Sequence, residues 1–227
     1  MKRILCLLLI GVLLICCSSC RAGIADGSQM AMTCSKDSVE ELIAITGEFD
    51  LGGLSTGMWI DAEHCYNITP PAVAQLTDIK LFKFSDSCVS LALIDGEVYE
   101  LCASFGGWGL VSAVPWDYDE DGNYDLLIAS SWGSGLHRSE ITVFNTVTKE
   151  SIVVYDTLGT EDPSVDLVVV AVSPALSSKA PQDHPVSYQI YSADIIFNNH
   201  AADLSYTTTG LVGSIVAEDG VPVFQPK

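Results

Sequence analysis

The chain has 227 residues, of which 29 are Asp or Glu and 10 are Lys or Arg, so its formal net charge is −19. Such an excess of carboxylates has no means of neutralising a phosphate backbone, which excludes nucleic acid as the expected partner. Hydrophobic residues make up 48% and charged residues 17%, which excludes disorder over the whole length. The length predicts a domain with a sizeable core of its own.

The first twenty residues are typical of an export signal. Lys2 and Arg3 precede an apolar run over 4–15 that is too short to span a bilayer comfortably, and two serines and Cys20 follow. This end resembles a bacterial lipoprotein signal, in which a Cys after small residues becomes the lipid-bearing N-terminus. The resemblance implies removal of residues 1–19, lipidation of Cys20, and an extracytoplasmic protein held at the cell membrane or cell surface by its lipid. The alternative is an ordinary cleaved secretory signal.

Residues 20–33 lack periodicity and predict a flexible tether between the lipid and the domain. Residues 34–77 predict one short helix followed by an irregular connection. Ser38 and Glu41 have the spacing of a capping box, and Gly47 is expected to end the helix. The pair of prolines at 70–71 indicates a break.

Residues 78–227 predict a β domain that carries a calcium-binding loop. Short apolar stretches alternate there with turn signals, as in antiparallel sheets. The fold class expected is all-β and antiparallel, either β-propeller-like or a β-sandwich, with one short N-terminal helix. The expected strands are 79–84, 89–94, 97–101, 110–116, 126–128, 141–144, 152–155, 167–172, 186–191, 195–197, 212–217 and 221–224.

Four cysteines beyond Cys20 permit two disulfides in an exported chain. Cys88 and Cys102 flank a hairpin whose turn is Asp95-Gly96, a strong hairpin signal. The pairs Cys88–Cys102 and Cys34–Cys65 are one interpretation, and four buried thiols are the other. A strict two-residue turn would place Cys102 opposite Val89, one position away from Cys88.

One motif carries chemistry, and it reads D-x-D-x-D-G-x-x-D. Oxygen ligands at alternate positions converge on one point when the backbone curls, and the glycine permits the curl. Clustered carboxylates repel one another unless a cation lies among them, and an all-oxygen ligand set favours Ca²⁺. The alternative is a solvated acidic turn. The expected ligands are the carboxylates of Asp117, Asp119, Asp121 and Asp125 and the backbone carbonyl of Asn123.

The flanks of this motif are strand-like, which separates it from a helix-flanked calcium loop. The run over 105–146, with Gly-rich segments at 105–109 and 131–139 around the Asp loop, resembles the FG-GAP or VCBS repeat of integrin-α-type β-propellers. The resemblance implies a Ca²⁺ site between two strands. An apolar run after Asp166 echoes the run after Asp125 at a blade-sized spacing, and the alternative is two ordinary hairpins.

Trp132, His137 and Arg138 lie in a Gly- and Ser-rich segment and form a candidate ligand patch, which Trp108 and Trp116 would extend. The alternative is that the tryptophans are core residues and that the two basic side chains are solvated.

The sequence contains none of the common hydrolase or phosphate-binding signatures. It therefore favours a lipid-anchored, extracytoplasmic, calcium-binding β module that recognises a glycan or a protein. The alternative is an extracytoplasmic hydrolase in which Ca²⁺ is structural and a carboxylate pair elsewhere is catalytic.

Overall fold

A computed structural model of the chain describes residues 30–31, 35–36, 38–46, 62–85, 88–102, 105–172, 187–198, 200 and 202–227. All of them belong to one compact unit, Gly27–Pro174 with Asp183–Lys227. The export signal, Cys20, Cys34 and most of the expected tether over 20–33 lie outside the described residues. No helix in the described part of the chain has the length and hydrophobicity needed to cross a membrane.

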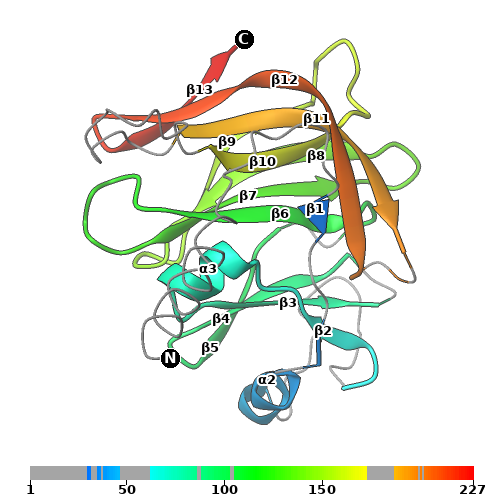
Figure 1. Cartoon of the computed structure of the whole chain (residues 1–227), viewed down its shortest axis with the longest axis vertical. Coiled ribbons are helices and arrows are strands. Elements are labelled where there is room, and N and C mark those ends of the chain that lie inside the picture. Colours follow the sequence, from blue (N-terminus) through cyan, green and yellow to red (C-terminus); the bar gives the residue numbers. More distant parts are fainter. Residues whose placement is uncertain are drawn as a thin grey trace, which may run out of the picture. The chain divides into compact units, whose positions relative to one another are not determined.

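The described strands form three antiparallel sheets, in each of which strands that follow one another in the chain are paired (Figure 1). The N-terminal sheet contains β2 (Cys65–Asn67), β3 (Lys80–Phe84), β4 (Ser90–Ile94) and β5 (Glu97–Glu100). The central sheet contains β6 (Gly109–Trp116), β7 (Asp125–Trp132), β8 (Arg138–Phe144) and β9 (Ser151–Asp156). The C-terminal sheet contains β10 (Asp166–Val172), β11 (Ser187–Phe197), β12 (Leu204–Glu218) and β13 (Val221–Pro226), with β1 (Met30–Ala31) paired to β12.

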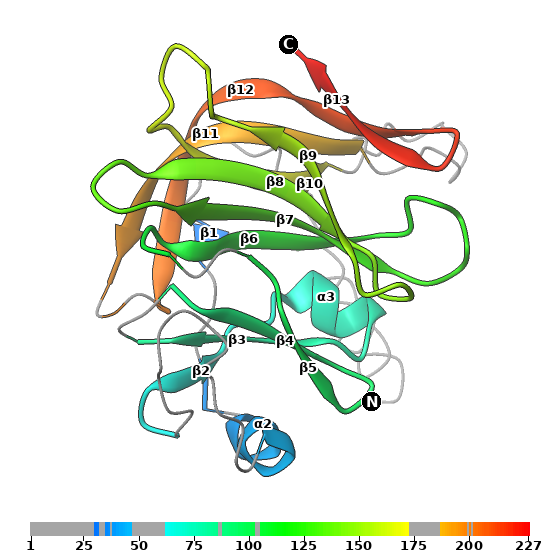
Figure 2. The ribbon, with the colours of Figure 1, turned by 180° about the vertical axis from the view of Figure 1, so that it is seen from behind.

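In the central sheet, β6, β7 and β8 are buried on both faces because the sheet lies between the other two sheets, whereas the edge strand β9 is largely exposed (Figure 2). Side chains of a strand alternate between its faces. Along β7, Leu126 and Ile128 therefore enter a core shared with the N-terminal sheet, while Leu127 and Ala129 enter a core shared with the C-terminal sheet. This double burial explains why the run after Asp125 is apolar at every position.

The expected all-β, antiparallel fold is confirmed. Four-stranded meanders are also the unit from which β-propellers are built. In the described part of the chain, however, the three sheets form a stack and do not close into a ring. The repeat suggested by Asp125 and Asp166 is not a repeat of equivalent strands. Asp125 opens β7, the second strand of its sheet, whereas Asp166 opens β10, the first strand of the next.

The described residues contain two helices, and only the first was expected. α2 (Val39–Thr46) lies in the predicted helical segment and ends just before Gly47. α3 (Pro71–Leu76) lies where the sequence predicts an irregular connection. Pro71 stands within the first turn, where proline's missing N–H costs nothing because that group has no partner inside the helix. The proline pair therefore starts a helix here rather than only breaking the chain.

The predicted hairpin turn at Asp95-Gly96 is present, and Asp219-Gly220 forms a turn of the same kind between β12 and β13. Asp95 and Gly96 have φ values of 54° and 81°, and Asp219 and Gly220 have φ values of 53° and 74°. Two consecutive residues with positive φ are characteristic of the type I′ turn, whose twist matches that of paired strands. The C-terminal strands are longer than predicted, since β11 runs without a break from Ser187 to Phe197, and β12 begins well before residue 212.

Cys88 and Cys102 are free thiols in the structure, so the pairing that the sequence allowed between them is not formed. The two-residue turn pairs Leu91 with Glu100, and Leu101 donates to the carbonyl of Ser90. This register leaves Cys102 facing Val89 rather than Cys88. Burial raises the pKa of both thiols, that of Cys102 to about 12.

Candidate metal site

The Asp-rich motif forms the connection between β6 and β7, and its carboxylates accept hydrogen bonds from the backbone of the same loop. The N–H of Gly122 donates to Asp117 Oδ2 at 3.2 Å, and the N–H of Asp121 donates to Asp119 Oδ1 at 3.3 Å. The N–H of Asn123 donates to Asp121 Oδ1 at 2.7 Å. These bonds stabilise the curl that the alternating Asp spacing predicts.

Gly122 has a φ of 86°, in the left-handed region that side-chain-bearing residues rarely adopt. A Cβ atom placed there would meet no atom within 4 Å. The glycine is therefore required by backbone conformation and not by lack of space. Glu120, two residues earlier, adopts a φ of 59°, which gives the loop a second sharp change of direction.

Carboxylate oxygens of Asp117, Asp119 and Asp121 lie within 4.8 Å of one another. The first two side chains are half-buried, and the third is exposed. Three negative charges at this separation repel one another, and a bound cation reverses the sign of that interaction. The arrangement can therefore hold a metal ion through oxygen ligands alone.

Asp125 lies outside this group of three but is the fourth expected carboxylate ligand, and it is buried. Its side chain is only 1% exposed. Its Oδ1 accepts hydrogen bonds from the N–H of Thr146 at 2.7 Å and from the Thr146 hydroxyl at 3.2 Å. Its Oδ2 is buried and has no hydrogen-bond partner, and the same holds for Oδ1 of Asp117. Buried polar atoms normally have partners, so two carboxylate oxygens without one beside an Asp cluster are suited to cation binding.

Burial raises the pKa of Asp125 to about 6, and the charges of Asp119 and Asp121 add to the increase. The two hydrogen bonds from Thr146 oppose it. Among the five expected ligands, the structure thus brings three carboxylates together and places the fourth close enough to respond to two of them. Asn123 follows Gly122 in the same loop.

The turn between β8 and β9 supports the Asp-rich loop. This contact was not predicted from the sequence. Asn145 Nδ2 donates to the hydroxyl of Tyr118 at 3.1 Å and to Asp119 Oδ2 at 3.4 Å. Its Oδ1 accepts from the N–H groups of Val147 and Thr148, which fixes the turn itself. No local pattern could reveal these contacts, because they join residues 26 and 27 positions apart in sequence.

The candidate ligand patch lies at the other end of the same strand. Trp132 ends β7 and pairs with Arg138, whose guanidinium carbon lies 5.3 Å from the Trp132 ring centroid. The His137 ring lies 5.1 Å from the ring of Trp108, edge to face. A strand rises about 3.3 Å per residue, so about 23 Å of β7 separate Trp132 from Asp125.

Trp116 does not belong to this patch. It is 8% exposed and packs in the core between the central and C-terminal sheets. Its ring contacts those of Tyr118 and Tyr188 at centroid distances of 5.7 and 5.0 Å. Trp116 is therefore a structural residue at the start of the Asp-rich loop. It lies on the face of β6 that packs against the C-terminal sheet.

Trp108 joins the patch to the C-terminal sheet. Its indole Nε1 donates to Asp166 Oδ2 at 3.3 Å, and its ring lies 4.9 Å from that of the half-exposed Phe197. Burial raises the pKa of Asp166, while the Trp108 hydrogen bond and the charge of His137 lower it in part.

Comparisons of the chain with protein-family models, with curated proteins and with solved structures found no match. The resemblance of residues 105–146 to an FG-GAP repeat therefore rests on the loop and its flanking strands.

Proposed function

We propose that the chain is a lipid-anchored, extracytoplasmic module that binds Ca²⁺ in its β6–β7 loop and recognises a glycan or a protein. The observation that carries the proposal is the pair of buried carboxylate oxygens on Asp117 and Asp125 that lack partners beside the Asp cluster. Without a cation, both oxygens have lost their hydration and gained nothing in return.

The ligand set favours Ca²⁺ over other metals. The clustered groups are all carboxylates, with no His or Cys among them. Oxygen ligands select hard cations, whereas Zn²⁺ and Cu²⁺ prefer nitrogen or sulfur. A loop that offers several carboxylates and a carbonyl suits the larger, more flexible coordination shell of Ca²⁺, while Mg²⁺ requires a near-ideal octahedron and keeps its waters.

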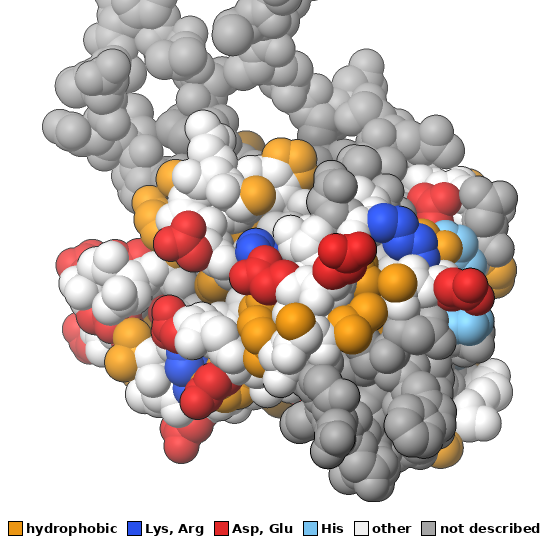
Figure 3. Space-filling model, turned by 90° about the horizontal axis from the view of Figure 1, so that it is seen from below, with side chains coloured by type: hydrophobic (Ala, Val, Ile, Leu, Met, Phe, Trp, Pro, Cys, Tyr) orange, Lys and Arg blue, Asp and Glu red, His pale blue; other side chains and the backbone are white. Residues whose placement is uncertain are grey.

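The lipid anchor is supported by the sequence of residues 1–20. The acidic body makes a tether necessary for membrane association, since a chain of net charge −19 is repelled by anionic head groups. On the face seen in Figure 3, acidic side chains are spread among hydrophobic ones, and the few basic side chains lie next to acidic ones.

Calorimetric titration of residues 21–227 with Ca²⁺ tests the metal site. We expect saturable binding to the unmodified sequence, weaker binding of Mg²⁺, and loss of the heat in Asp121→Asn. Glu120→Gln removes the same charge from the same loop without removing an expected ligand, and it should retain most of the affinity. Absence of a binding heat, or equal loss in both variants, would mean that the loop is only an acidic turn.

A turnover assay separates recognition from hydrolysis. Ester and glycan substrates incubated with the Ca²⁺-loaded protein should be recovered intact. Catalytic release of product, retained after purification to homogeneity, would contradict the recognition module and favour the hydrolase.

A further inference from the structure

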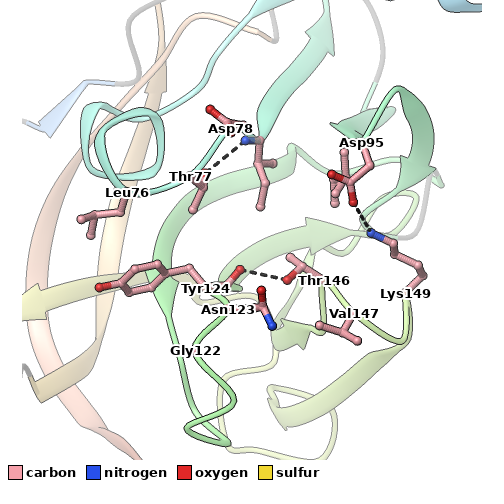
Figure 4. Close-up of a pocket in the computed structure, with 12 residues that line it drawn as sticks. Leu76, Thr77, Asp78, Asp95, Gly122, Asn123, Tyr124, Thr146, Val147 and Lys149 are labelled. Carbon is pink, nitrogen blue, oxygen red and sulfur yellow. Dashed lines mark hydrogen bonds and ion pairs between the residues drawn. The ribbon is translucent and has the colours of Figure 1, made fainter.

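A groove of about 500 Å³ is lined on one side by the second half of the Asp-rich β6–β7 loop (Figure 4). Residues 122–124 of the loop line it together with Thr146, Val147 and Lys149 of the β8–β9 turn. The segment 76–79 between α3 and β3, and residues 94–95 at the end of β4, complete the lining. The volume lies within the range of small-molecule binding sites.

The two ends of the groove differ in chemistry. Leu76 and Tyr124 lie together at one end, 49% and 39% exposed. At the other end, Lys149 Nζ lies 3.5 Å from Asp95 Oδ2 and 5.2 Å from the ring centroid of Tyr99. A partly exposed tyrosine side chain thus lies at the opposite end of the groove from a charged pair that can donate and accept hydrogen bonds.

Polar side chains lie between these ends. Figure 4 shows the Asn123 carboxamide pointing into the space between Tyr124 and Lys149. Among the described residues, this carboxamide has no hydrogen-bond partner. Asp78 adds a carboxylate at the rim. The groove therefore contains hydrogen-bond donors and acceptors, on Asn123 and Asp78, as well as the aromatic ring of Tyr124.

The charge of the lining selects among ligand classes. Asp78 and Asp95 outnumber Lys149, which is already paired, and the whole chain is strongly acidic. Phosphorylated, sulfated and acidic ligands are repelled. A peptide adding as a β-strand requires a free strand edge, whereas this lining consists mainly of turns and loops. A neutral sugar presents hydroxyl groups that both donate and accept, and an apolar C–H face that can pack on an aromatic ring.

Metal and groove share residues. The loop backbone at Gly122 and Asn123 curls around the carboxylates. The single proton of the Thr146 hydroxyl is shared between Asp125 Oδ1 at 3.2 Å and the carbonyl of Tyr124 at 2.9 Å. A cation that fixes this loop also fixes the positions of Asn123 and Tyr124. We infer that this groove binds a neutral saccharide in a Ca²⁺-dependent manner, an inference that rests on the proposed calcium site.

Titration with neutral hexasaccharides of glucose, mannose, galactose and N-acetylglucosamine, at saturating Ca²⁺, tests the inference. We expect at least one to bind, with an affinity lowered about tenfold by Tyr124→Ala, as loss of one stacked aromatic face predicts. Phe105→Ala removes another exposed aromatic ring, away from the groove, and should leave the affinity unchanged. Lys149→Met changes a groove residue that is not an expected metal ligand, so it should weaken saccharide binding while retaining Ca²⁺ binding.

The outcomes separate this inference from the proposed function. If the protein binds Ca²⁺ but no neutral hexasaccharide, the saccharide inference is wrong and the proposed calcium site is retained. If it binds neither Ca²⁺ nor a hexasaccharide, the saccharide inference and the calcium site are both wrong. Saccharide binding unchanged by EDTA would overturn the coupling. If Trp132→Ala lost saccharide binding and Tyr124→Ala kept it, the saccharide would bind at the patch at the end of β7 and the groove would be the wrong site. Tighter binding of oligogalacturonate than of any neutral sugar would contradict the charge selection.

Discussion

The backbone N–H of Thr146 donates a 2.7 Å hydrogen bond to Oδ1 of Asp125. This bond joins the β8–β9 turn to the residue that closes the metal loop. It occupies one oxygen of the carboxylate and orients the side chain, while Oδ2 is left buried and unpartnered. In the proposed calcium site, the scaffold would thus hold the Asp125 carboxylate in position before a metal binds, which would lower the ordering cost of binding.

Replacing Asp125 by Asn should have opposite effects on the metal-free and the metal-loaded protein. The amide oxygen still accepts from Thr146, and the amide nitrogen can donate to neighbouring carboxylates. Removing a buried, uncompensated charge should stabilise the protein in EDTA by about 1 kcal/mol, which is about 2–4 °C in melting temperature for a domain of this size. Ca²⁺ should then add little. Thermal melts in EDTA and in Ca²⁺ measure both effects, and a lower melting temperature than wild type in EDTA would contradict the prediction.

Saturating Ca²⁺ should raise the melting temperature of the wild-type protein by several degrees. A ligand that binds only the folded state at a hundredfold excess over Kd stabilises it by about 2.7 kcal/mol. Asp121→Asn should lose most of this rise, and Glu120→Gln should keep it. Melting curves that superimpose in Ca²⁺ and EDTA for the wild-type protein would count against a metal in this loop.

Features set by local chemistry were predictable from the sequence. The Asp95-Gly96 turn follows from the need for two positive φ values, and the curl of the metal loop follows from Asp spacing around Gly122. Both depend on residues that are neighbours in the chain. The polar segment 207–210 of β12 was missed for the converse reason, since only its pairing with β11 makes it a strand.

Contacts between distant segments could not be predicted. Thr146 looks like any turn residue, and nothing near it indicates that it orients Asp125. Lys83 alternates with apolar residues as a solvent-facing side chain would, yet it is fully buried. β3 is covered on one face by the central sheet and on the other by α2, so side chains on both of its faces are buried.

Lys83 leads to a test of this packing. Its Nζ donates to the carbonyls of Trp108 and Leu110 at 2.6 and 3.1 Å, joining the N-terminal sheet to the start of β6. Lys83→Met leaves both carbonyls without that donor and should lower the free energy of unfolding by about 2 kcal/mol. Lys80→Met, which removes a surface ion pair with Glu41, should change it by less than about 1 kcal/mol. Denaturant titration of both variants compares them, and equal effects would refute the role given to Lys83.

Lipidation can be tested on protein isolated from membranes of its host. Mass spectrometry of the N-terminal peptide should give a chain that begins at Cys20 and carries acyl groups. The expectation follows from the basic start, the apolar run and the two serines before Cys20. Detection of residues 1–19 still attached, or of an unmodified N-terminus beyond Cys20, would contradict it.

Asp166 should make stability depend on pH. Burial raises the pKa of this carboxyl above its usual value, the Trp108 hydrogen bond and the charge of His137 reduce the increase, and Asp194 adds to it. The folded state therefore holds the proton more tightly than the unfolded state does. Its contribution to stability is full below the unfolded pKa of about 3.9 and is lost as pH rises through the raised folded pKa.

Asp166→Asn removes this loss, because the amide cannot ionise and its oxygen still accepts from Trp108. The melting temperature of Asp166→Asn minus that of wild type should therefore increase as pH rises from about 4 to 7. Measurement in EDTA keeps the metal loop the same in both proteins, and titration of Asp125 then cancels in the difference. Asp162→Asn, which changes an exposed turn residue, controls for the change in net charge. A difference that stays constant with pH, or that decreases, would mean that the Asp166 carboxyl is not destabilised by its burial.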